Sequence, residues 1–145
     1  MCNRFENKVA IVTGAASGIG QSAAVLFARE GAKLTICDVN MDGLAETERQ
    51  IIAAGGECLK VKVNVRSQAD VEACVNGTLE KFGTIDILVN NAGTGQFLPF
   101  AMMENEEYER VMEINVRGIF FFSRAVLPTM MDKDYGKIVN ITSIM

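Results

Sequence analysis

The sequence contains no histidine among its 145 residues. Histidine is the most common general base in enzymes and a frequent zinc ligand, so its absence excludes the usual form of both. The four cysteines, Cys2, Cys37, Cys58 and Cys74, include no C-x-x-C pair, which leaves a zinc site or a Cys-His nucleophile without support. We therefore expect no metal site and reduced thiols, with Cys37 and Cys74 acting as small hydrophobic residues.

The chain also lacks a cluster of lysine and arginine, and its net charge is -4. This balance argues against nucleic acids or anionic membranes as partners. No apolar run approaches the length of a membrane span, and residues 1–8 are too polar for a signal peptide. We expect a cytoplasmic protein, and the length and the 49% of hydrophobic residues suit one domain with its own core.

The rest of the chain is organised around residues 13–20, Thr-Gly-Ala-Ala-Ser-Gly-Ile-Gly. This stretch follows an apolar run at residues 9–12 that is typical of a buried strand, and it opens a helical pattern. Its glycines let the backbone approach a ligand closely, and the start of a helix directs unpaired N–H groups at an anion such as a pyrophosphate. The glycine spacing differs from G-x-G-x-x-G, so the motif alone is a weak signal.

An acidic residue at the end of the second predicted strand strengthens this interpretation. The apolar run at residues 34–37 ends at Asp38, eighteen residues after Gly20. A carboxylate at this point can accept hydrogen bonds from both hydroxyls of an adenosine ribose. The alternative is that Asp38 caps the next helix.

Predicted strands alternate with predicted helices along the whole chain. We expect strands at residues 9–12, 33–37, 57–63, 85–89 and 137–141, with a helix after each of the first four. Parallel strands need crossover connections, so this order predicts an α/β doubly wound parallel sheet, the Rossmann fold. The third strand alternates apolar residues with lysines, which predicts a sheet edge. The predicted strand ends gather the following residues in one crevice: Gly14, Asp38, Asn64, Asn90 and Ser143.

Several separated motifs together resemble the classical short-chain dehydrogenase/reductase family. They are residues 13–20, Asp38, the Asn-Asn-Ala-Gly of residues 90–93, Asn115, and the Ile-Val-Asn-Ile-Thr-Ser of residues 138–143. The resemblance covers the whole chain in the family's order. It implies an NAD-binding Rossmann domain at residues 1–145, incomplete at its C-terminal end, from an oxidoreductase that transfers hydride between nicotinamide and a small-molecule alcohol or ketone.

The resemblance assigns the adenosine end of the cofactor to two strand ends. Asp38 favours NAD over NADP, because a 2'-phosphate would meet a carboxylate and no arginine or lysine follows directly. Where this chain has Asn64 before Val65, the family usually has an aspartate that holds the adenine amino group. The amide oxygen of Asn64 can also accept from that amine, whereas the alternative is an asparagine that only ends an edge strand.

The motif at residues 90–93 is implied to support the nicotinamide end. Small residues at Ala92 and Gly93 let the backbone pass close to the nicotinamide ribose, and Asn90 would bond the adenosine side or the ends of neighbouring strands. The full set of expected cofactor-binding residues is Gly14, Ser17, Gly18, Ile19, Gly20, Asp38, Asn64, Val65, Asn90, Ala92 and Gly93.

Two catalytic positions follow from the same resemblance. In the family, the asparagine at the position of Asn115 interrupts the last helix and holds a water of a proton relay. The alternative is a buried asparagine bonded to the backbone. Ser143 corresponds to the serine whose hydroxyl bonds the oxygen of the substrate.

The family's Tyr-x-x-x-Lys pair is missing from this sequence. The pair needs helical spacing so that the ammonium lowers the pKa of the phenol. Tyr135 cannot replace it, because it precedes the strand at residues 137–141 and so lies at the opposite end of the sheet from Ser143. We therefore expect the 145-residue chain alone to be inactive. The alternative is a non-catalytic module, either a truncated isoform or a paralogue, that binds a dinucleotide or another protein.

The last predicted helix, which begins near Asn105 and ends near Met131, carries more apolar surface than one sheet face covers. Its Ile-Phe-Phe-Phe run at residues 119–122 points in several directions around the helix axis. The family uses this helix in dimer contacts, so we expect a homo-oligomer that forms through it.

Overall fold

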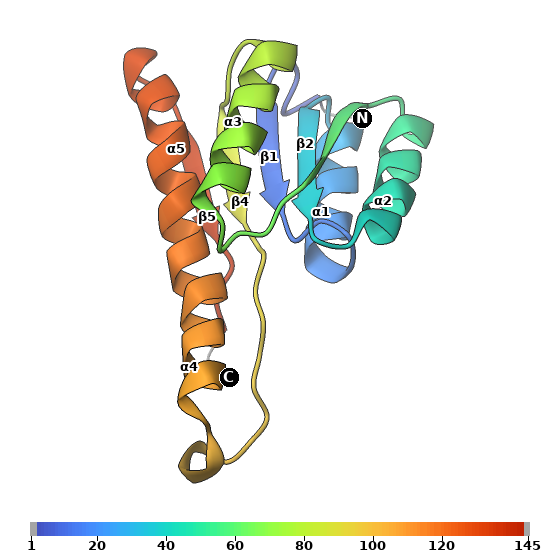
Figure 1. Ribbon diagram of the computed structural model, residues 1–145. Coiled ribbons are helices and arrows are strands. Elements are labelled where there is room, and N and C mark those ends of the chain that lie inside the picture. Colours follow the sequence, from blue (N-terminus) through green and yellow to red (C-terminus); the bar gives the residue numbers. More distant parts are fainter. Residues whose placement is uncertain (1–2, 144–145) are drawn as a thin grey trace.

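The computed structural model describes residues 3–143, and the strands in that range form one parallel sheet. The strand order is β3-β2-β1-β4-β5 (Figure 1). Cys2, one of the expected reduced thiols, lies outside the described residues. The strands are β1 Val9–Thr13, β2 Lys33–Asp38, β3 Glu57–Lys62, β4 Ile87–Asn90 and β5 Lys137–Asn140.

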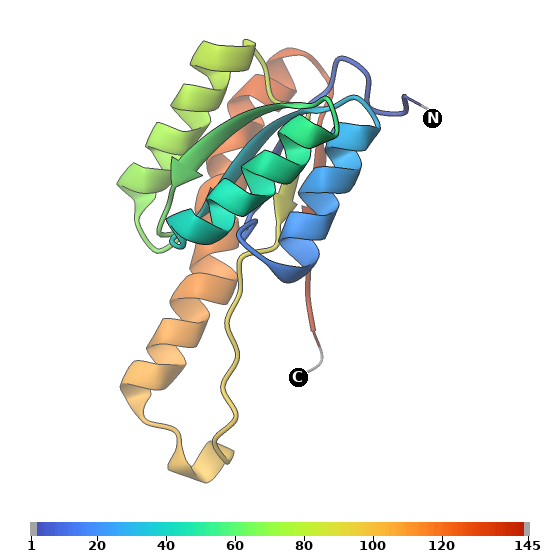
Figure 2. The ribbon, with the colours of Figure 1, turned by 90° about the vertical axis from the view of Figure 1, so that its right-hand side faces the viewer.

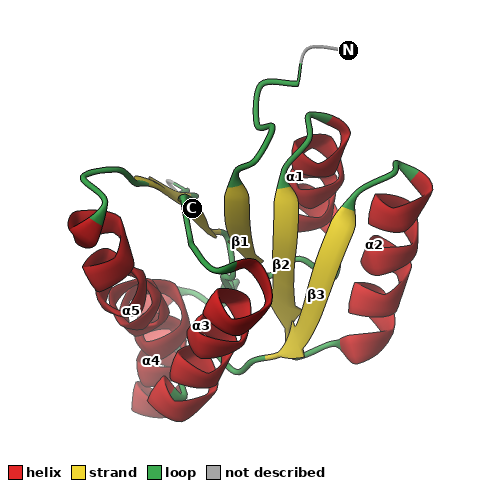
Figure 3. Cartoon of the chain, turned by 90° about the horizontal axis from the view of Figure 1, so that it is seen from above, coloured by secondary structure: helices red, strands yellow, loops and turns green. Residues whose placement is uncertain are grey.

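Helices cover both faces of the sheet. α1 and α2 pack on one face, and α3 and α5 pack on the other (Figure 3). The helices are α1 Gly18–Arg29, α2 Met41–Ala53, α3 Gln68–Phe82, α4 Asn105–Met112 and α5 Gly118–Asp132, and a short 3-10 turn at Phe100–Met102 precedes α4. The predicted doubly wound α/β sheet is confirmed, and β3 lies at an edge as predicted.

The central strand β1 is buried at every position because it contributes to two cores. Successive side chains of a strand point to opposite faces of the sheet. Ala10 and Val12 therefore join the core beneath α1 and α2. Ile11 joins the other core, where it meets Val71 of α3 and the fully buried Phe122 of α5. Burial on both faces explains why β1 reads as a continuous apolar run.

The fourth strand begins at Ile87, two residues later than predicted. The residue before it is Asp86, whose carboxylate accepts the backbone N–H of Val9 at 2.9 Å and the ammonium of Lys133 at 2.7 Å. The backbone of Asp86 is also bonded on both sides: its N–H donates to the carbonyl oxygen of Val9 and its carbonyl oxygen accepts the N–H of Lys137, each at 2.9 Å. The ion pair between Asp86 and Lys133 links the start of β4 to the end of α5, at the end of the sheet where the strands begin.

The last helical region is interrupted. A π-helical segment, Glu113–Arg117, joins α4 to α5. Such a segment is a wider turn that often marks a functional position, and Asn115 lies within it. α4 and the loop before it extend well beyond the sheet, on the side where the strands end (Figures 1 and 2).

No helix among residues 3–143 is long and apolar enough to cross a membrane. Within the same residues, no group of three or more cysteine, aspartate or glutamate side chains is placed to hold a metal ion.

Candidate functional site

The loop between β1 and α1 leaves the start of a helix open to a ligand. Gly14 and Gly18 have φ angles of 64° and 57°, a region in which glycine is strongly favoured. Ser17, the N-cap residue, makes no side-chain capping bond, and the first turn of α1 holds no acidic residue. Its N–H groups and the positive end of the helix dipole therefore remain available to an anion.

Two glycines of this loop are required by packing. A Cβ atom added at Gly14 would lie 2.8 Å from Cα of Ala92, and one added at Gly20 would lie 2.3 Å from the carbonyl oxygen of Gly14. A Cβ at Gly18 would meet nothing within 4 Å. Gly14 and Gly20 thus let the loop pack against the end of β4, whereas Gly18 faces open space where a ligand could approach.

Asp38 connects the end of β2 to the glycine loop. Its carboxylate accepts the N–H of Ala16 at 3.2 Å and the N–H of Asn40 at 3.0 Å. The N-cap of α2 is Asn40, whose side chain accepts the N–H of Gly43 at 3.1 Å, so the capping alternative for Asp38 does not hold. A carboxylate has about four acceptor positions, so two remain for the hydroxyls of a ribose.

A hollow of about 160 Å³ lies beside Asp38 at the ends of the strands. Six expected cofactor-binding residues line it, together with the apolar side chains of Val39, Val63 and Ile114. It is smaller than the roughly 300 Å³ at which drug-sized pockets begin, so it could enclose only part of a larger ligand. The six residues are Gly14, Asp38, Asn64, Val65, Ala92 and Gly93.

Asn64 shapes the loop after β3. Its side-chain oxygen accepts the N–H of Arg66 at 3.1 Å, and its own N–H donates to the carboxylate of Asp70 at 2.9 Å. That backbone bond, followed by one from the hydroxyl of Ser67, lowers the pKa of Asp70. The side chain of Asn64 thus holds a turn while it lines the hollow.

The motif at residues 90–93 forms hydrogen bonds that connect the end of β4 to the ends of β5 and β1. The side-chain amide of Asn90, which is buried, donates to Oδ1 of Asn140 at 2.9 Å and to Oγ of Ser123 at 3.3 Å. Of the two roles considered for Asn90, the structure shows the contact with a neighbouring strand end. Asn91 donates from its amide to the carbonyl oxygens of Thr13 and Gly14, each at 3.1 Å.

The sequence reasoning did not single out Asn91, Thr13, Val39 or Ile114. Oγ1 of Thr13 accepts the N–H groups of Asn91 and Ala92, at 3.0 and 2.9 Å. In the sequence, Asn91 stands out only as part of the motif at residues 90–93, and Thr13 only as the first residue of the glycine motif. Val39 and Ile114 are ordinary apolar residues in the sequence, and only the fold brings them to one hollow.

Asn115 holds the loop that follows β4. Its side-chain oxygen accepts the N–H of Thr94 and its amide donates to the carbonyl oxygen of Thr94, both at 2.8 Å. These are the backbone bonds of the alternative, although Asn115 is half-buried and not fully buried. Arg110 reinforces it by donating to Oγ1 of Thr94 at 2.8 Å.

β5 leads Ser143 to the same edge of the sheet as the glycine loop. The N–H of Ile141 donates to the carbonyl oxygen of Asn90 at 2.9 Å, so the chain after β5 runs beside the end of β4. Tyr135 lies at the opposite end, because its ring is 4.2 Å from the ammonium of Lys8, which precedes β1. The exclusion of Tyr135 from the region of Ser143 is therefore confirmed.

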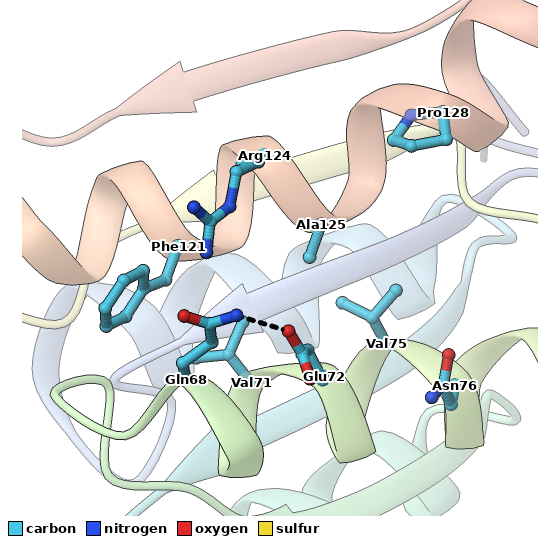
Figure 4. A pocket seen from close by; sticks show the side chains of 9 residues that line it. All are labelled: Gln68, Val71, Glu72, Val75, Asn76, Phe121, Arg124, Ala125 and Pro128. Atoms are coloured by element: carbon cyan, nitrogen blue, oxygen red, sulfur yellow. Dashed lines mark hydrogen bonds between the residues drawn. The ribbon is translucent and has the colours of Figure 1, made fainter.

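A second hollow lies between α3 and α5, away from all of these residues. It measures about 320 Å³. Figure 4 shows Phe121 and Arg124 of α5 opposite Gln68 and Glu72 of α3, with a hydrogen bond of 2.6 Å from Gln68 to Glu72. No expected site residue lines this groove.

Comparison with known proteins places the chain in a family. The model of the short chain dehydrogenase family matches residues 8–145. A curated relative, 2-(R)-hydroxypropyl-CoM dehydrogenase of Xanthobacter autotrophicus, is 42% identical over 142 residues, which are 95% of this chain and 57% of the relative.

Solved structures are also similar to this chain over nearly its whole length. NAD+-bound xylitol dehydrogenase has a TM-score of 0.94 at 36% identity, covering 97% of this chain and 55% of that one. A metagenomic short-chain oxidoreductase in complex with NADP has a TM-score of 0.92 at 33% identity, covering 97% of this chain and 64% of that one.

The fold by itself defines a doubly wound α/β protein with its open crevice at the ends of the strands. With the comparisons, the class becomes definite: the chain belongs to the short-chain dehydrogenase/reductase family, as the motifs predicted. This is a family of oxidoreductases. The chain spans slightly more than half of the length of the relatives it matches, 57% in the case of the Xanthobacter enzyme.

Proposed function

We propose that this chain is the NAD-binding part of an oxidoreductase that transfers hydride between nicotinamide and a small-molecule alcohol or ketone. The observation that carries the proposal is the hollow at the strand ends, which six expected cofactor-binding residues line. The bound nicotinamide would accept or donate the hydride. The residues of this chain would hold and orient the cofactor.

Each part of the cofactor has a matching group in the crevice. The open N–H groups at the start of α1 would hold the pyrophosphate. Asp38 would accept from the adenosine ribose, and the apolar Val39, Val65 and Ile114 would flank the adenine. Ala92 and Gly93, which also line the hollow, would let the backbone approach the nicotinamide ribose.

The preference for NAD over NADP rests on Asp38. A 2'-phosphate would meet its carboxylate, and the next residue, Val39, offers no positive charge. The related structures include both an NAD+ and an NADP complex, so the resemblance does not distinguish the two cofactors. The choice rests on the side chains at the end of β2. We infer NAD from the carboxylate.

A titration of NAD into the wild type and Asp38→Ala tests the proposal. Loss of hydrogen bonds to a charged group costs about 1.5–3 kcal/mol, so the Kd for NAD should rise about tenfold or more. Asp42→Ala is the matched control, because it removes an exposed carboxylate from the first turn of α2 that does not line the hollow. Equal or tighter binding of NAD by Asp38→Ala would refute the assignment.

Turnover needs a proton as well as a hydride. A positioned acid or base contributes about 10²–10⁴-fold, and the sequence has neither histidine nor a Tyr-x-x-x-Lys pair. Ser143 would orient the oxygen of the substrate, and Asn115 would keep the loop at Thr94 in place. The 145-residue chain should therefore give no NADH from a panel of secondary alcohols. Saturable turnover that Ser143→Ala abolishes would contradict this.

A non-catalytic dinucleotide-binding or protein-interaction module is the second candidate. Exposed apolar side chains on α5 and the π-helical segment before it, such as Val116, Phe120 and Met131, favour a role in protein contacts. Sequencing the transcript separates the two: a reading frame that continues into a helix with this pair supports the enzyme, and a stop codon after codon 145 supports the module.

We also propose that the chain forms homo-oligomers through α4 and α5. An exposed apolar stripe runs along their outer surface, and a groove of about 690 Å³ lies on it. Exposed apolar side chains that gather along one surface are typical of an interaction site. Sedimentation should show dimers or larger species, and a compact monomer at high concentration would contradict the proposal. The stripe consists of Tyr108, Met112, Val116, Phe120, Leu127 and Met131.

A further inference from the structure

The π-helical segment Glu113–Arg117 contacts both loops that border the hollow. Its Asn115 holds Thr94 in the loop after β4. Its first residue, Glu113, accepts a hydrogen bond of 2.6 Å from Nε of Arg66, which lies in the loop after β3. Between these two contacts, Ile114 lines the hollow itself. The segment therefore lies where the two strand-end loops and the crevice meet.

The carboxylate of Glu113 accepts hydrogen bonds from two arginines, one in a distant loop and one in its own helical region. Its Oε2 binds Arg66, 47 residues away in the sequence. Its Oε1 accepts Nη1 of Arg117, one turn further along the same helical region, at 2.9 Å. Only the bond to Arg66 connects the helix with a crevice loop, whereas the bond to Arg117 stays within one element.

The loop of Arg66 has few other anchors to the long helix. Its internal bonds are local, because Asn64 accepts from Arg66 and Ser67 and donates to Asp70. Val65 adds apolar packing: it lies against the core that contains Phe122 of α5, and a Cβ atom at the buried Gly118 would lie 2.9 Å from Cβ of Val65. The Glu113 to Arg66 ion pair is thus a polar link between this loop and the π-helical segment, in addition to the packing of Val65.

We propose that Glu113 is a positioning residue for the adenine end of the crevice, acting through Arg66 on the loop of Asn64 and Val65. This inference rests on the proposed function, since it assumes that the hollow takes adenine. The side chain of Glu113 is 24% exposed and that of Arg66 is 44% exposed. The pair is therefore accessible to solvent, and its main effect is to keep the loop preorganised, with little contribution to the stability of the fold.

The first test needs no ligand. Amide hydrogen exchange is measured in the wild type, in Glu113→Gln and in Arg66→Gln, and the N–H groups of Asn64, Arg66 and Ser67 should exchange faster in both variants. Arg117→Gln is the matched control, since it removes a partner of the same carboxylate that does not touch the loop. Unchanged exchange in Glu113→Gln, or an equal increase in Arg117→Gln, would overturn the proposal.

The second test measures binding of ADP-ribose and of nicotinamide mononucleotide to the same variants. Loss of an exposed ion pair should raise the Kd for ADP-ribose about threefold to fivefold in Glu113→Gln and Arg66→Gln, and no further in the double variant. The Kd for nicotinamide mononucleotide should not change, which a general loss of folding would not reproduce. Equal weakening of both ligands, or none, would overturn the proposal. If the wild type itself fails to bind ADP-ribose, the proposed function is wrong, and the exchange measurement alone decides the role of Glu113.

Discussion

The substitution Gly20→Ala tests how tightly the glycine loop is packed. Gly20 lies in the first turn of α1, and an added Cβ atom would stand 2.3 Å from the carbonyl oxygen of Gly14 and 2.5 Å from the amide nitrogen of Asn91. Real Cβ atoms do not approach other atoms this closely. The loop must therefore move, and Asn91 must give up its bonds to Thr13 and Gly14.

The steric destabilisation of Gly20→Ala is partly offset by the higher helix propensity of alanine. Replacing glycine by alanine in a helix interior gains about 0.5–1 kcal/mol. Overpacking against backbone atoms costs about 1–3 kcal/mol, and each buried hydrogen bond that is lost adds about 1 kcal/mol. The net expectation is a loss of about 2 kcal/mol in the free energy of unfolding. The pyrophosphate loop would shift with it, so NAD binding should weaken as well.

Gly77→Ala provides a control with the opposite sign. Gly77 lies within α3, and a Cβ atom there would meet only Cδ2 of Leu59, at 3.7 Å, an ordinary contact. This variant should gain about 0.5–1 kcal/mol. Urea unfolding followed by circular dichroism measures both variants against the wild type. A midpoint for Gly20→Ala at or above that of the wild type would refute the packing argument.

Two further predictions concern charged groups. Lys133→Met should lower the free energy of unfolding, measured in urea, by about 3 kcal/mol. Lys133 donates to Thr84, Ile85 and Asp86, each at 2.7 Å, and its removal leaves the buried carboxylate of Asp86 without its cation. A decrease below about 1 kcal/mol would contradict this. The lowered pKa of Asp70 means that its contribution is present above its unfolded pKa of about 3.9 and is lost as pH falls through the lower folded value. The stability difference between the wild type and Asp70→Asn, about 1 kcal/mol or less for so exposed a group, should therefore shrink between pH 5 and pH 2, and a constant difference over that range would refute the linkage.

The sequence predicted the order of the elements because its apolar runs and glycines are local signals. Alternation of strands and helices led to the parallel sheet, and the position of Asp38 at the end of β2 followed from counting along the chain. What the sequence did not reveal depends on long-range contacts. Asn91 and Thr13 act through bonds between the ends of β1 and β4, and Ile114, in the π-helical segment, lines the hollow beside strand ends that are distant in the sequence.

The roles of single side chains are harder to predict from the sequence, because they also depend on long-range contacts. An asparagine carries both a donor and an acceptor, so Asn64, Asn90 and Asn115 fit either a ligand or a backbone partner. In the structure, all three bond the protein: Asn64 closes a turn, Asn90 reaches β5 and Asn115 holds Thr94. Asp38 also bonds the loop, yet its carboxylate keeps spare acceptor positions.

The most direct test of the proposed cofactor site is to map NAD on the chain by backbone amide chemical shifts. We predict shifts at residues 14–20, at Asp38, and at Asn64 and Val65 beside the hollow, with none at Gln68, Glu72 or Arg124 in the groove between α3 and α5. Shifts confined to that groove, or no saturable shifts at the glycine loop, would contradict the claim that this crevice binds the dinucleotide.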